Sequence, residues 1–332
     1  MFHLVPFNAL FAQLGPTNIF APASAPSDYL YEVALLALAV TGAIFLPVAG
    51  LLVYVAVKYR SRLSDTSEPL QVYGSRQLEL AWTVLPVLIV MVLFLSSARV
   101  IHAVQDARKP KDAIEVVVVA HQFWWEYFYP QYGFVTANEL HIPVSDPRHP
   151  TPTFMTLLSA DTNHDFWVPR LAGKTDLIPN HPNSMWMEPR ETGLYLGQCN
   201  EYCGTSHALM LLRVYVQSRQ EFGRWVKAQQ QTDLTLESFS HDASEGRKVF
   251  ERTACIDCHS IAGTIADGRF GPELRHLMSR ETIAAGIAPN TAQNLRSWIQ
   301  NPNALKPGAR MPAMGLSDQE LDEVTAYMMA LH

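Results

Sequence analysis

The residues most able to do chemistry lie in the loop GQCNEYCGTSHALM, residues 197–210, of a chain that has only four cysteines. Cys199, Cys203, His207 and Met210 follow one another there as C-x-x-x-C-x-x-x-H-x-x-M. Thiolate, thioether and imidazole ligands favour copper among the biological metals. A single blue-copper ion needs one cysteine, whereas two thiolates shared between two ions make a binuclear centre. The loop therefore indicates a binuclear copper centre.

Such a centre needs a second histidine from elsewhere in the chain, and His164 is the candidate. It stands in ADTNHDFWVPRLAGKTD, and we expect it at the end of a strand. The alternative is a structural disulfide between Cys199 and Cys203, because an oxidising compartment permits one. That disulfide would suit the metal-free protein.

A second chemical motif lies near the C-terminus. Cys255, Cys258 and His259 form C-x-x-C-H, the attachment signature of c-type haem, in which two thiols form thioethers and the histidine binds iron. A zinc site would need a second cysteine pair nearby, and a thioredoxin-like redox pair would need a βαβ context. For the sixth position of the iron, the segment KPGARMPAM offers Met311 and Met314.

Two apolar runs precede these motifs, at residues 33–57 and 80–98, and each is long enough to span a bilayer. Two buried helices of a soluble domain are the alternative. The connecting loop carries several basic residues, and the first thirty residues carry none, so the positive-inside rule places the loop in the cytoplasm and the rest outside. These basic residues are Lys58, Arg60, Arg62 and Arg76. The apolar start MFHLVPFNALFAQLG lacks a basic region and is a poor signal peptide.

The composition of the 332 residues, with a net charge of -6, gives no indication of nucleic-acid binding. From residue 114, short runs rich in Val, Tyr and Phe between turn formers predict a compact antiparallel β-domain that ends near Val226. The polar segment KAQQQTDLTLESFSHDAS predicts a linker. Helical periodicity follows in SEGRKVFERT, AQNLRSWIQ and SDQELDEVTAYMMALH, with Ser317 as an N-cap before Glu320.

The last ninety residues resemble class I cytochrome c domains, on the motifs GRKVF, CIDCH, GPEL and LRSWIQNPNALKPGARMP. The resemblance implies that Met311 is the axial ligand, with Met314 as the fallback. It also implies that the Pro272 carbonyl orients the ligand histidine and that Trp298 packs against haem. We expect the remaining histidines of this segment, His276 and His332, at the surface.

The whole chain resembles subunit II of a haem–copper cytochrome c oxidase, in the form with a fused cytochrome c domain. The motifs are LELAWTVLP, HQFWWEYFYP, the H-x-x-x-x-P-x-x-x-x-K-x-D string from His164, and the copper loop. The resemblance implies a multidomain membrane protein with a two-helix transmembrane hairpin, a cupredoxin-like antiparallel β-sandwich or barrel, and a small all-α class I cytochrome c domain. It implies these copper ligands: His164, Cys199, Cys203, His207, Met210 and the backbone carbonyl of Glu201.

The expected segments are an extracytoplasmic N-terminal part that is a candidate for processing, the hairpin, the copper domain, a linker and the cytochrome c domain. Their boundaries are 1–29, 30–105, 112–228, 229–241 and 242–332.

Other positions carry over from the same resemblance. The Glu201 carboxylate is expected to help bind a magnesium ion shared with subunit I, and Glu79, three residues before Trp82, is expected at the cytoplasmic mouth of a proton channel. Residues expected to face subunit I near the proton exit are Asp161, Lys174 and Asp176. Each of these acidic or basic residues also fits an ordinary solvated charge.

One departure from the family pattern concerns electron transfer. The family usually has Trp-Tyr-Trp where this sequence has Phe123, Trp124 and Trp125. The first tryptophan, which receives electrons from soluble cytochrome c in many members, is thus Phe123, so we expect the fused haem domain to supply the electrons. From His241 on, 9 Lys and Arg stand against 11 Asp and Glu, so we expect the linker, acting as a tether, rather than charge to bring that domain to the copper loop.

The resulting hypothesis is an electron-transfer subunit of an oxygen-reducing, proton-translocating oxidase of the bacterial inner membrane, with the copper and cytochrome domains on the periplasmic side. Electrons pass from a donor through haem c to copper and on to the haem and copper of subunit I, and this chain itself has no oxygen-reducing site. Expected partners are subunits I and III and a donor such as a cytochrome c, another small redox protein or a quinol–cytochrome c reductase. A membrane-anchored copper carrier and a copper-containing nitric oxide reductase subunit are the alternatives.

Overall fold

The computed structural model describes residues 17–60, 71, 73–146, 148, 150–231 and 239–332. It divides into two compact units, one made of Met1–Ser27 with Arg108–His332 and the other of Asp28–Ala107. The apolar start at residues 1–15 and the loop residue Arg62 lie outside the described residues. So do residues 232–238 of the expected linker, and the expected segment boundaries stay predictions.

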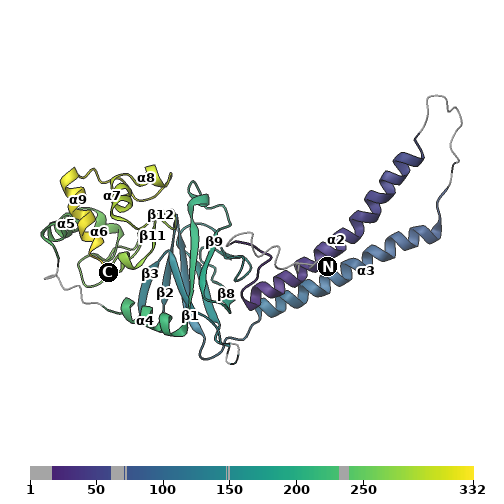
Figure 1. Cartoon of the computed structure of the whole chain (residues 1–332), viewed down its shortest axis with the longest axis horizontal. Helices are drawn as coiled ribbons and strands as arrows, with labels where there is room; N and C mark the ends of the chain where they lie inside the picture. The colour runs from purple at the N-terminus through teal and green to yellow at the C-terminus, as the bar shows by residue number, and fades with distance from the viewer. Residues whose placement is uncertain (1–16, 61–70, 72, 147, 149, 232–238) are drawn as a thin grey trace, which may run out of the picture. The chain divides into compact units, whose positions relative to one another are not determined.

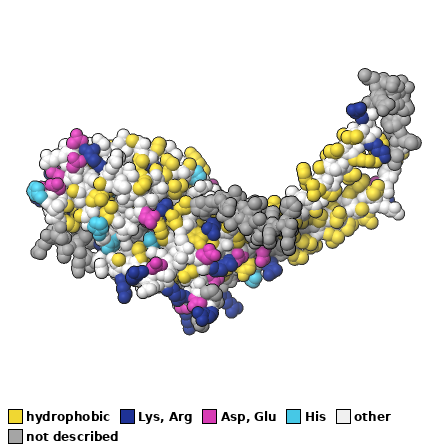
Figure 2. All heavy atoms as spheres, viewed as in Figure 1, with side chains coloured by type: hydrophobic (Ala, Val, Ile, Leu, Met, Phe, Trp, Pro, Cys, Tyr) yellow, Lys and Arg dark blue, Asp and Glu magenta, His cyan; other side chains and the backbone are white. Residues whose placement is uncertain are grey.

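The smaller unit is built from two long apolar helices, α2 (Ala25–Lys58) and α3 (Arg76–Gln105), both with a mean hydropathy of 2.4 in their most apolar window. They have 34 and 30 residues, so both exceed the roughly 20 residues that a bilayer requires. Their hydrophobic side chains are exposed along most of their length (Figure 2). The helices meet around Tyr29 and Val100 and diverge toward the connecting loop (Figure 1). Both predicted spans lie inside these helices.

The larger unit contains a sandwich of two five-stranded sheets, with strand orders β3-β2-β1-β5-β8 and β4-β10-β9-β6-β7. Burial alternates along the longer strands, because successive side chains point to opposite faces of a sheet. The inward faces form one core that includes Trp125, Tyr127, Phe166 and Leu212. The strands are β1 (Ile114–His121), β2 (Trp124–Tyr129), β3 (Phe134–Ala137), β4 (Glu139–Pro143), β5 (Thr153–Ser159), β6 (His164–Trp167), β7 (Thr175–Leu177), β8 (Asn183–Met187), β9 (Gly193–Cys199) and β10 (Leu211–Gln217).

Most pairings of the sandwich are antiparallel as predicted, and two are parallel, namely β1 with β5 and β4 with β10. Asn138, which has a positive φ of 64°, lies where the chain passes from β3 into β4 of the other sheet. Asparagine tolerates this left-handed conformation better than most residues. The chain then returns to the first sheet at β5, which lies beside β1 and runs parallel to it.

The last element of the β-domain along the chain is a helix. Helix α4 (Arg219–Gln229) begins at Ser218, which forms a capping box with Glu221, and it buries Phe222 and Val226 against the sandwich. The other end of the domain is covered by the described part of the N-terminal segment. There Ala23 N donates to Arg170 O at 2.8 Å, and Ser24 bridges to Pro189.

The cytochrome segment is helical, as expected. Helices α5 and α9 lie side by side (Figure 1), and Gly246 permits their close contact, because a Cβ there would lie 1.9 Å from Glu323 O. The predicted N-cap is confirmed, since Ser317 and Glu320 form a capping box. The elements are α5 (His241–Arg252), α6 (Cys255–Cys258), η3 (Leu277–Ser279), β11 (Thr282–Ile283), β12 (Ala288–Pro289), α7 (Ala292–Gln300), α8 (Pro302–Leu305) and α9 (Asp318–Met329).

The expectation of a surface position was wrong for His276 and right for His332. His276 is buried because its Nδ1 lies 2.8 Å from the carbonyl oxygen of His332 and its Nε2 lies 3.2 Å from the carbonyl oxygen of Gln229. The ring thus joins the end of α4 to the C-terminus of the chain. His332 itself is exposed.

The buried His141 predicts acid sensitivity of the sandwich. It stacks between Tyr215 and Trp225, and burial lowers its pKa to about 4 from an ordinary 6.5. Between these values the unfolded chain binds a proton that the folded chain does not, so stability should fall as the pH falls from 6.5 to 4 and then level off, by at most about 3 kcal/mol.

Urea unfolding followed by tryptophan fluorescence at several pH values measures this. The variant His141→Phe should lose that part of the pH dependence, whereas His181→Phe, at an exposed position, should keep it. Equal acid sensitivity in wild type and His141→Phe would contradict the assignment.

Candidate functional site

The pairing of β6 with β9 brings the predicted copper ligands together. His164 is the first residue of β6 and Cys199 is the last residue of β9, and the two strands pair in antiparallel fashion with Phe166 opposite Cys199. His164 thus lies at one end of a strand, as expected, and a turn separates β6 from β5, which ends at Ser159. His164 and Cys199 are 35 positions apart in the sequence, and the pairing of β6 with β9 brings them together.

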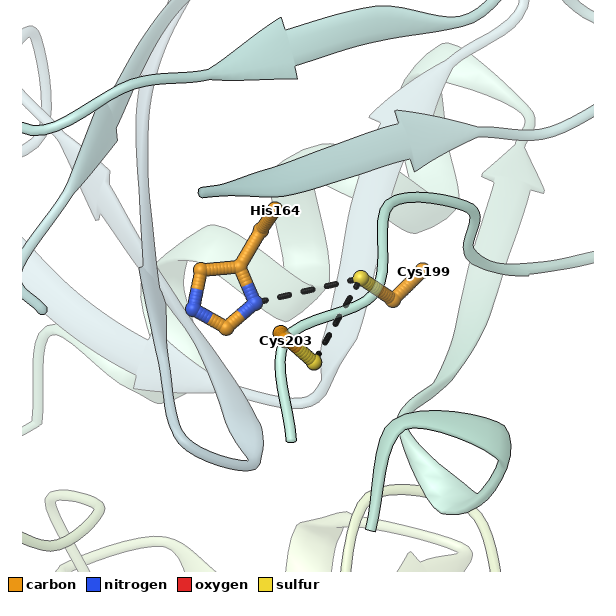
Figure 3. Close-up of side chains that lie close together, drawn as sticks. All are labelled: His164, Cys199 and Cys203. Carbon is orange, nitrogen blue, oxygen red and sulfur yellow. Dashed lines mark hydrogen bonds between the residues drawn. The ribbon is translucent and has the colours of Figure 1, made fainter. Parts of the chain in front are cut away.

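Four side chains of the loop and of β6 form a connected cluster (Figure 3 shows three of them). The Sγ atoms of Cys199 and Cys203 lie 3.9 Å apart, so the two thiols are not joined. His164 Nδ1 lies 3.8 Å from Cys199 Sγ, and His207 Nδ1 lies 3.6 Å from Cys203 Sγ. Ligand atoms of His164, Cys199 and Cys203 all lie within 4.8 Å of one another, and all three residues are buried.

Two further predicted ligands lie in the same loop. The backbone carbonyl oxygen of Glu201 is 3.3 Å from Cys199 Sγ, whereas the residue as a whole is exposed. Met210 is fully buried after the short turn η1 (His207–Leu209), and its backbone oxygen accepts a hydrogen bond from Cys199 N at 3.0 Å. The loop thus closes on itself with the sulfur ligands inside.

Asp161 orients the histidine that begins β6. His164 Nε2 donates to Asp161 Oδ1 at 2.8 Å, which turns Nδ1 toward the cysteines. Asp161 is itself fixed by Gln122 N, which donates to its Oδ2 at 2.6 Å. A carboxylate that holds the far nitrogen of a ligand histidine is usual in metal sites. Sequence reasoning missed this contact, although the signal was present in the spacing of three residues between the two.

The charges in the cluster favour a metal. Hydrogen bonding from Cys203 lowers the pKa of Cys199, aided by His164 and against the effect of burial, while Cys199 and burial raise the pKa of Cys203. One thiol thus ionises readily and the other is held protonated by its neighbour. A metal ion that replaces the shared proton would satisfy both sulfurs, since metals bind thiolates. Two thiols with two imidazoles and a thioether suit copper.

Helix α6 carries the second predicted site. Cys255 and Cys258 are free thiols at its two ends, both partly buried. His259 Nδ1 donates to Pro272 O at 2.8 Å, which leaves Nε2 as the nitrogen available to iron. Gly271 lets the chain pass over this ring, because a Cβ there would lie 2.5 Å from His259 Cε1. These features fit a covalently bound haem.

Several predicted residues surround these two sites. Met311 and Trp298 pack against the hydrophobic core of the cytochrome segment. Phe123, Trp124 and Trp125 are all buried, and Trp125 contacts His164 edge-on at 6.3 Å between ring centroids.

Other predicted residues are exposed. Lys174 and Asp176 are exposed, and Glu79 is an exposed residue of α3 in the other unit. Sequence reasoning missed Asp165, which faces Asp176 across the β6–β7 pair. Burial raises the pKa of Asp165 to about 7, and the Asp176 carboxylate adds to this.

Comparison with known proteins identifies the family. The model of the cytochrome c oxidase subunit II transmembrane domain matches residues 12–100, that of the periplasmic domain matches residues 148–217, and that of cytochrome c matches residues 243–332. The cytochrome c oxidase subunit 2 of Alkalihalophilus pseudofirmus is 32% identical over 326 residues, which are 96% of this chain and 92% of that protein. The chain belongs to the cytochrome c oxidase subunit II family.

Another relative and one solved structure are also similar to this chain. The cytochrome c oxidase subunit 2 of Bacillus subtilis is 31% identical over 329 residues, which are 93% of this chain and 90% of that protein. Among solved structures, the periplasmic domain of subunit II of cytochrome oxidase of Bradyrhizobium japonicum is 28% identical with a TM-score of 0.34, and it covers 37% of this chain and 96% of that chain.

Membership of the family confirms the predicted fold class and the resemblance on which it was based. The chain is a membrane-anchored subunit of the oxidase complex with a domain on the periplasmic or extracellular side, and it has no oxygen-reducing site of its own. It takes part in electron transfer in the oxidase, and its matched domains imply copper and haem.

Gly197 offers a test of the strand pair that assembles the copper cluster. A Cβ at this position would lie 2.1 Å from Trp167 O, which belongs to the backbone of β6 and cannot turn away. Gly197→Ala should therefore separate β6 from β9 and move His164 away from Cys199. We expect loss of most copper from the purified chain and a lower melting temperature.

Gly223→Ala is the matched control, because no atom lies within 4 Å of the added methyl group in α4. This variant should keep its copper and be slightly more stable, by about 0.5 to 1 kcal/mol. Copper content by atomic absorption and thermal unfolding by circular dichroism measure both effects. A full complement of copper in Gly197→Ala would contradict the proposed role of the strand pair.

Proposed function

We propose that this chain relays electrons from an external donor through its own haem c to a binuclear copper centre and on to the haem and copper of oxidase subunit I. The proposed copper ligands are His164, Cys199, Cys203, His207, Met210 and the Glu201 carbonyl. The proposed haem ligands are Cys255 and Cys258 as thioethers, with His259 and Met311 as axial ligands.

The observation that carries this proposal is the connected cluster of two thiols and two imidazoles around Cys199 and Cys203. When bound, a binuclear copper centre accepts and donates one electron with little change in geometry. The chain's own residues supply the conditions for this. Asp161 fixes the ring of His164, and the hydrogen bond from Cys199 N to Met210 O holds the loop closed, at 3.0 Å. A site held rigid by hydrogen bonds of this kind needs little reorganisation during electron transfer.

The haem segment supports the direction of the relay. Pro307–Arg310 lies beside the copper loop, where Ser206 Oγ donates a hydrogen bond to Pro307 O. This places the segment that leads to Met311 next to the loop that contains Cys203 and His207. Delivery of copper to another protein requires no electron transfer from a haem segment. The contact between this segment and the loop therefore favours the relay over a copper carrier.

The remaining parts of the proposal concern the complex around this chain. The copper and cytochrome domains lie on the periplasmic side of a bacterial inner membrane, with subunits I and III as partners. The donor is a cytochrome c, another small redox protein or a quinol–cytochrome c reductase. The Glu201 carboxylate, which is exposed, contributes to a magnesium ion shared with subunit I. Glu79 stands at the mouth of a proton channel.

Removing either shared thiol tests the copper assignment. Cys199→Ser and Cys203→Ser should each abolish the near-infrared absorption of a mixed-valence copper pair, because such a pair would need both thiolates. Glu201→Gln is the control, since it keeps the backbone carbonyl and changes only the exposed carboxylate. It should keep the absorption band. Retention of the band in either serine variant would overturn the binuclear assignment.

Replacing the two methionines tests the axial ligand of the haem. Met311 packs against the core of the cytochrome segment, whereas Met314 is not part of that group. Met311→Leu should therefore lower the haem c reduction potential and remove the absorption band of the sulfur–iron bond, because a thioether ligand raises the potential. Met314→Leu should leave both nearly unchanged. The opposite result would make Met314 the ligand.

A further inference from the structure

The cytochrome segment and the copper domain meet through polar contacts, two of which involve a buried charged side chain, Lys306 and Glu139. A Cβ at Gly308 of the cytochrome segment would lie 2.7 Å from Thr205 Cβ of the copper loop. Arg310 donates a hydrogen bond to the Gln122 side chain, which in turn donates to Cys203 O. The contact therefore involves the backbone and side chains of the copper loop itself.

Lys306 is the most deeply buried cation of this contact, with only 3% of its surface exposed. Its Nζ donates to Phe123 O of the copper domain at 2.7 Å and to Ala284 O of its own segment at 3.0 Å. Among the described residues, no carboxylate forms an ion pair with it. Burial lowers its pKa to about 7, so the group is an ammonium ion below about neutral pH. Two carbonyl oxygens, one from each side, thus take the place of water around this ammonium group.

Glu139 is the corresponding buried anion on the other side of the contact, with 2% of its surface exposed. It follows the turn at Asn138 and accepts three hydrogen bonds from the cytochrome segment. These come from Glu281 N at 3.0 Å, Thr282 N at 2.9 Å and Thr282 Oγ1 at 2.6 Å. Arg213 of the copper domain lies 3.8 Å from the same carboxylate.

The two contacts are reciprocal, since each domain buries one charge against backbone groups of the other. Burying a charge is costly unless hydrogen bonds with good geometry replace its water. The donors and acceptors here come from separate loops of both domains, so all of them are in place in one relative orientation only. A rotated or shifted cytochrome segment would leave at least one charge buried without partners.

We propose that Lys306 and Glu139 are positioning residues that fix the cytochrome segment on the copper domain in one orientation. The inference rests on the proposed relay and changes one expectation about it, namely that the tether alone supplies the local concentration of the haem domain. In the fixed arrangement, the segment containing Met311 stays against the copper loop between electron transfers. Transfer from haem to copper then requires no search by the haem domain.

A fixed arrangement predicts a particular response to salt. A domain that searches on a tether and docks by surface charge would respond to ionic strength, because salt screens exposed charges strongly over about 10 Å at 0.1 M. Buried charges are screened much less. The rate of electron transfer from haem c to copper within the wild-type oxidase should therefore change by less than about twofold from roughly 0.02 to 0.5 M salt.

The test uses the purified oxidase complex with the variants Lys306→Met and Glu139→Gln. Two measurements are made, namely the rate of electron transfer from haem c to copper after flash reduction, and hydrogen exchange of the peptides that contain Thr282 and Phe123. Each variant should exchange about tenfold faster at Thr282, transfer electrons about tenfold more slowly, and become dependent on salt, because a lost hydrogen bond to a charged group is worth about a factor of ten or more. Lys306→Arg, which can donate to both carbonyl oxygens, should restore most of the rate.

Matched controls separate the buried charges from charge in general. Lys248→Met and Glu115→Gln remove exposed charges, whose side chains are 67% and 42% exposed, and should leave exchange and salt response unchanged. Thr282→Val removes one hydroxyl donor to Glu139 with little change of shape, and serves if the other variants fail to fold. It should show a smaller change in the same direction.

The outcomes distinguish this inference from the relay itself. Near-infrared copper absorption and haem c spectra that are unchanged in every variant, together with faster exchange and salt-dependent transfer, support the positioning role. Wild-type exchange and salt-independent transfer in Lys306→Met, Glu139→Gln and Thr282→Val would overturn it. Absence of the copper or haem bands in the wild-type complex would instead overturn the relay, while the exchange measurement would still report on docking.

Discussion

The close approach of β6 and β9 at Gly197 is the constraint on which the cluster of predicted metal ligands depends. These strands lie so near each other that a single Cβ at Gly197 would collide with the backbone oxygen of Trp167. The pairing sets Phe166 opposite Cys199, and His164, two residues before Phe166, brings its Nδ1 within 3.8 Å of the Cys199 thiol. The loop then leads into β10, which pairs with β9, and Met210 is buried just before β10 begins. The positions of several predicted ligands thus depend on backbone hydrogen bonds between three strands.

The contact between the two redox segments is organised differently from either interior. Each segment has its own hydrophobic core, and the apolar cluster between them contains only Trp124, Ala137 and Ala285. The contact also includes several polar groups, among them the buried Lys306 and Glu139. Apolar surfaces adhere in many orientations, whereas hydrogen bonds to a buried charge are directional. The contact is therefore suited to specifying an orientation rather than to adding affinity.

Local patterns made a large part of this structure predictable from sequence. The loop of Cys199 and Cys203, the motif at Cys255 and the capping box at Ser317 are formed by neighbours along the chain, so their spacing alone determines what can meet. The parallel strand pairs join segments far apart in the sequence, such as β4 with β10, and no periodicity within a strand reveals its partner. The segment KPGARMPAM gives no indication that Lys306 is buried. Its partner, the backbone oxygen of Phe123, lies 183 positions away in the sequence. The buried position of His276 was missed for the same reason.

The close contact between Gly308 and Thr205 limits which proteins can reach the loop that contains Cys203 and His207. The φ of Gly308 is +85°, and the chain there passes so close to the copper loop that a methyl group would collide with it. A surface covered by the subunit's own cytochrome segment offers no docking place to a soluble protein. In the proposed relay, the donor would dock on the outer face of that segment, away from the proposed metal ligands. A change of donor would then require substitutions in the cytochrome segment, whereas the proposed copper loop would be free of selection by a diffusing protein.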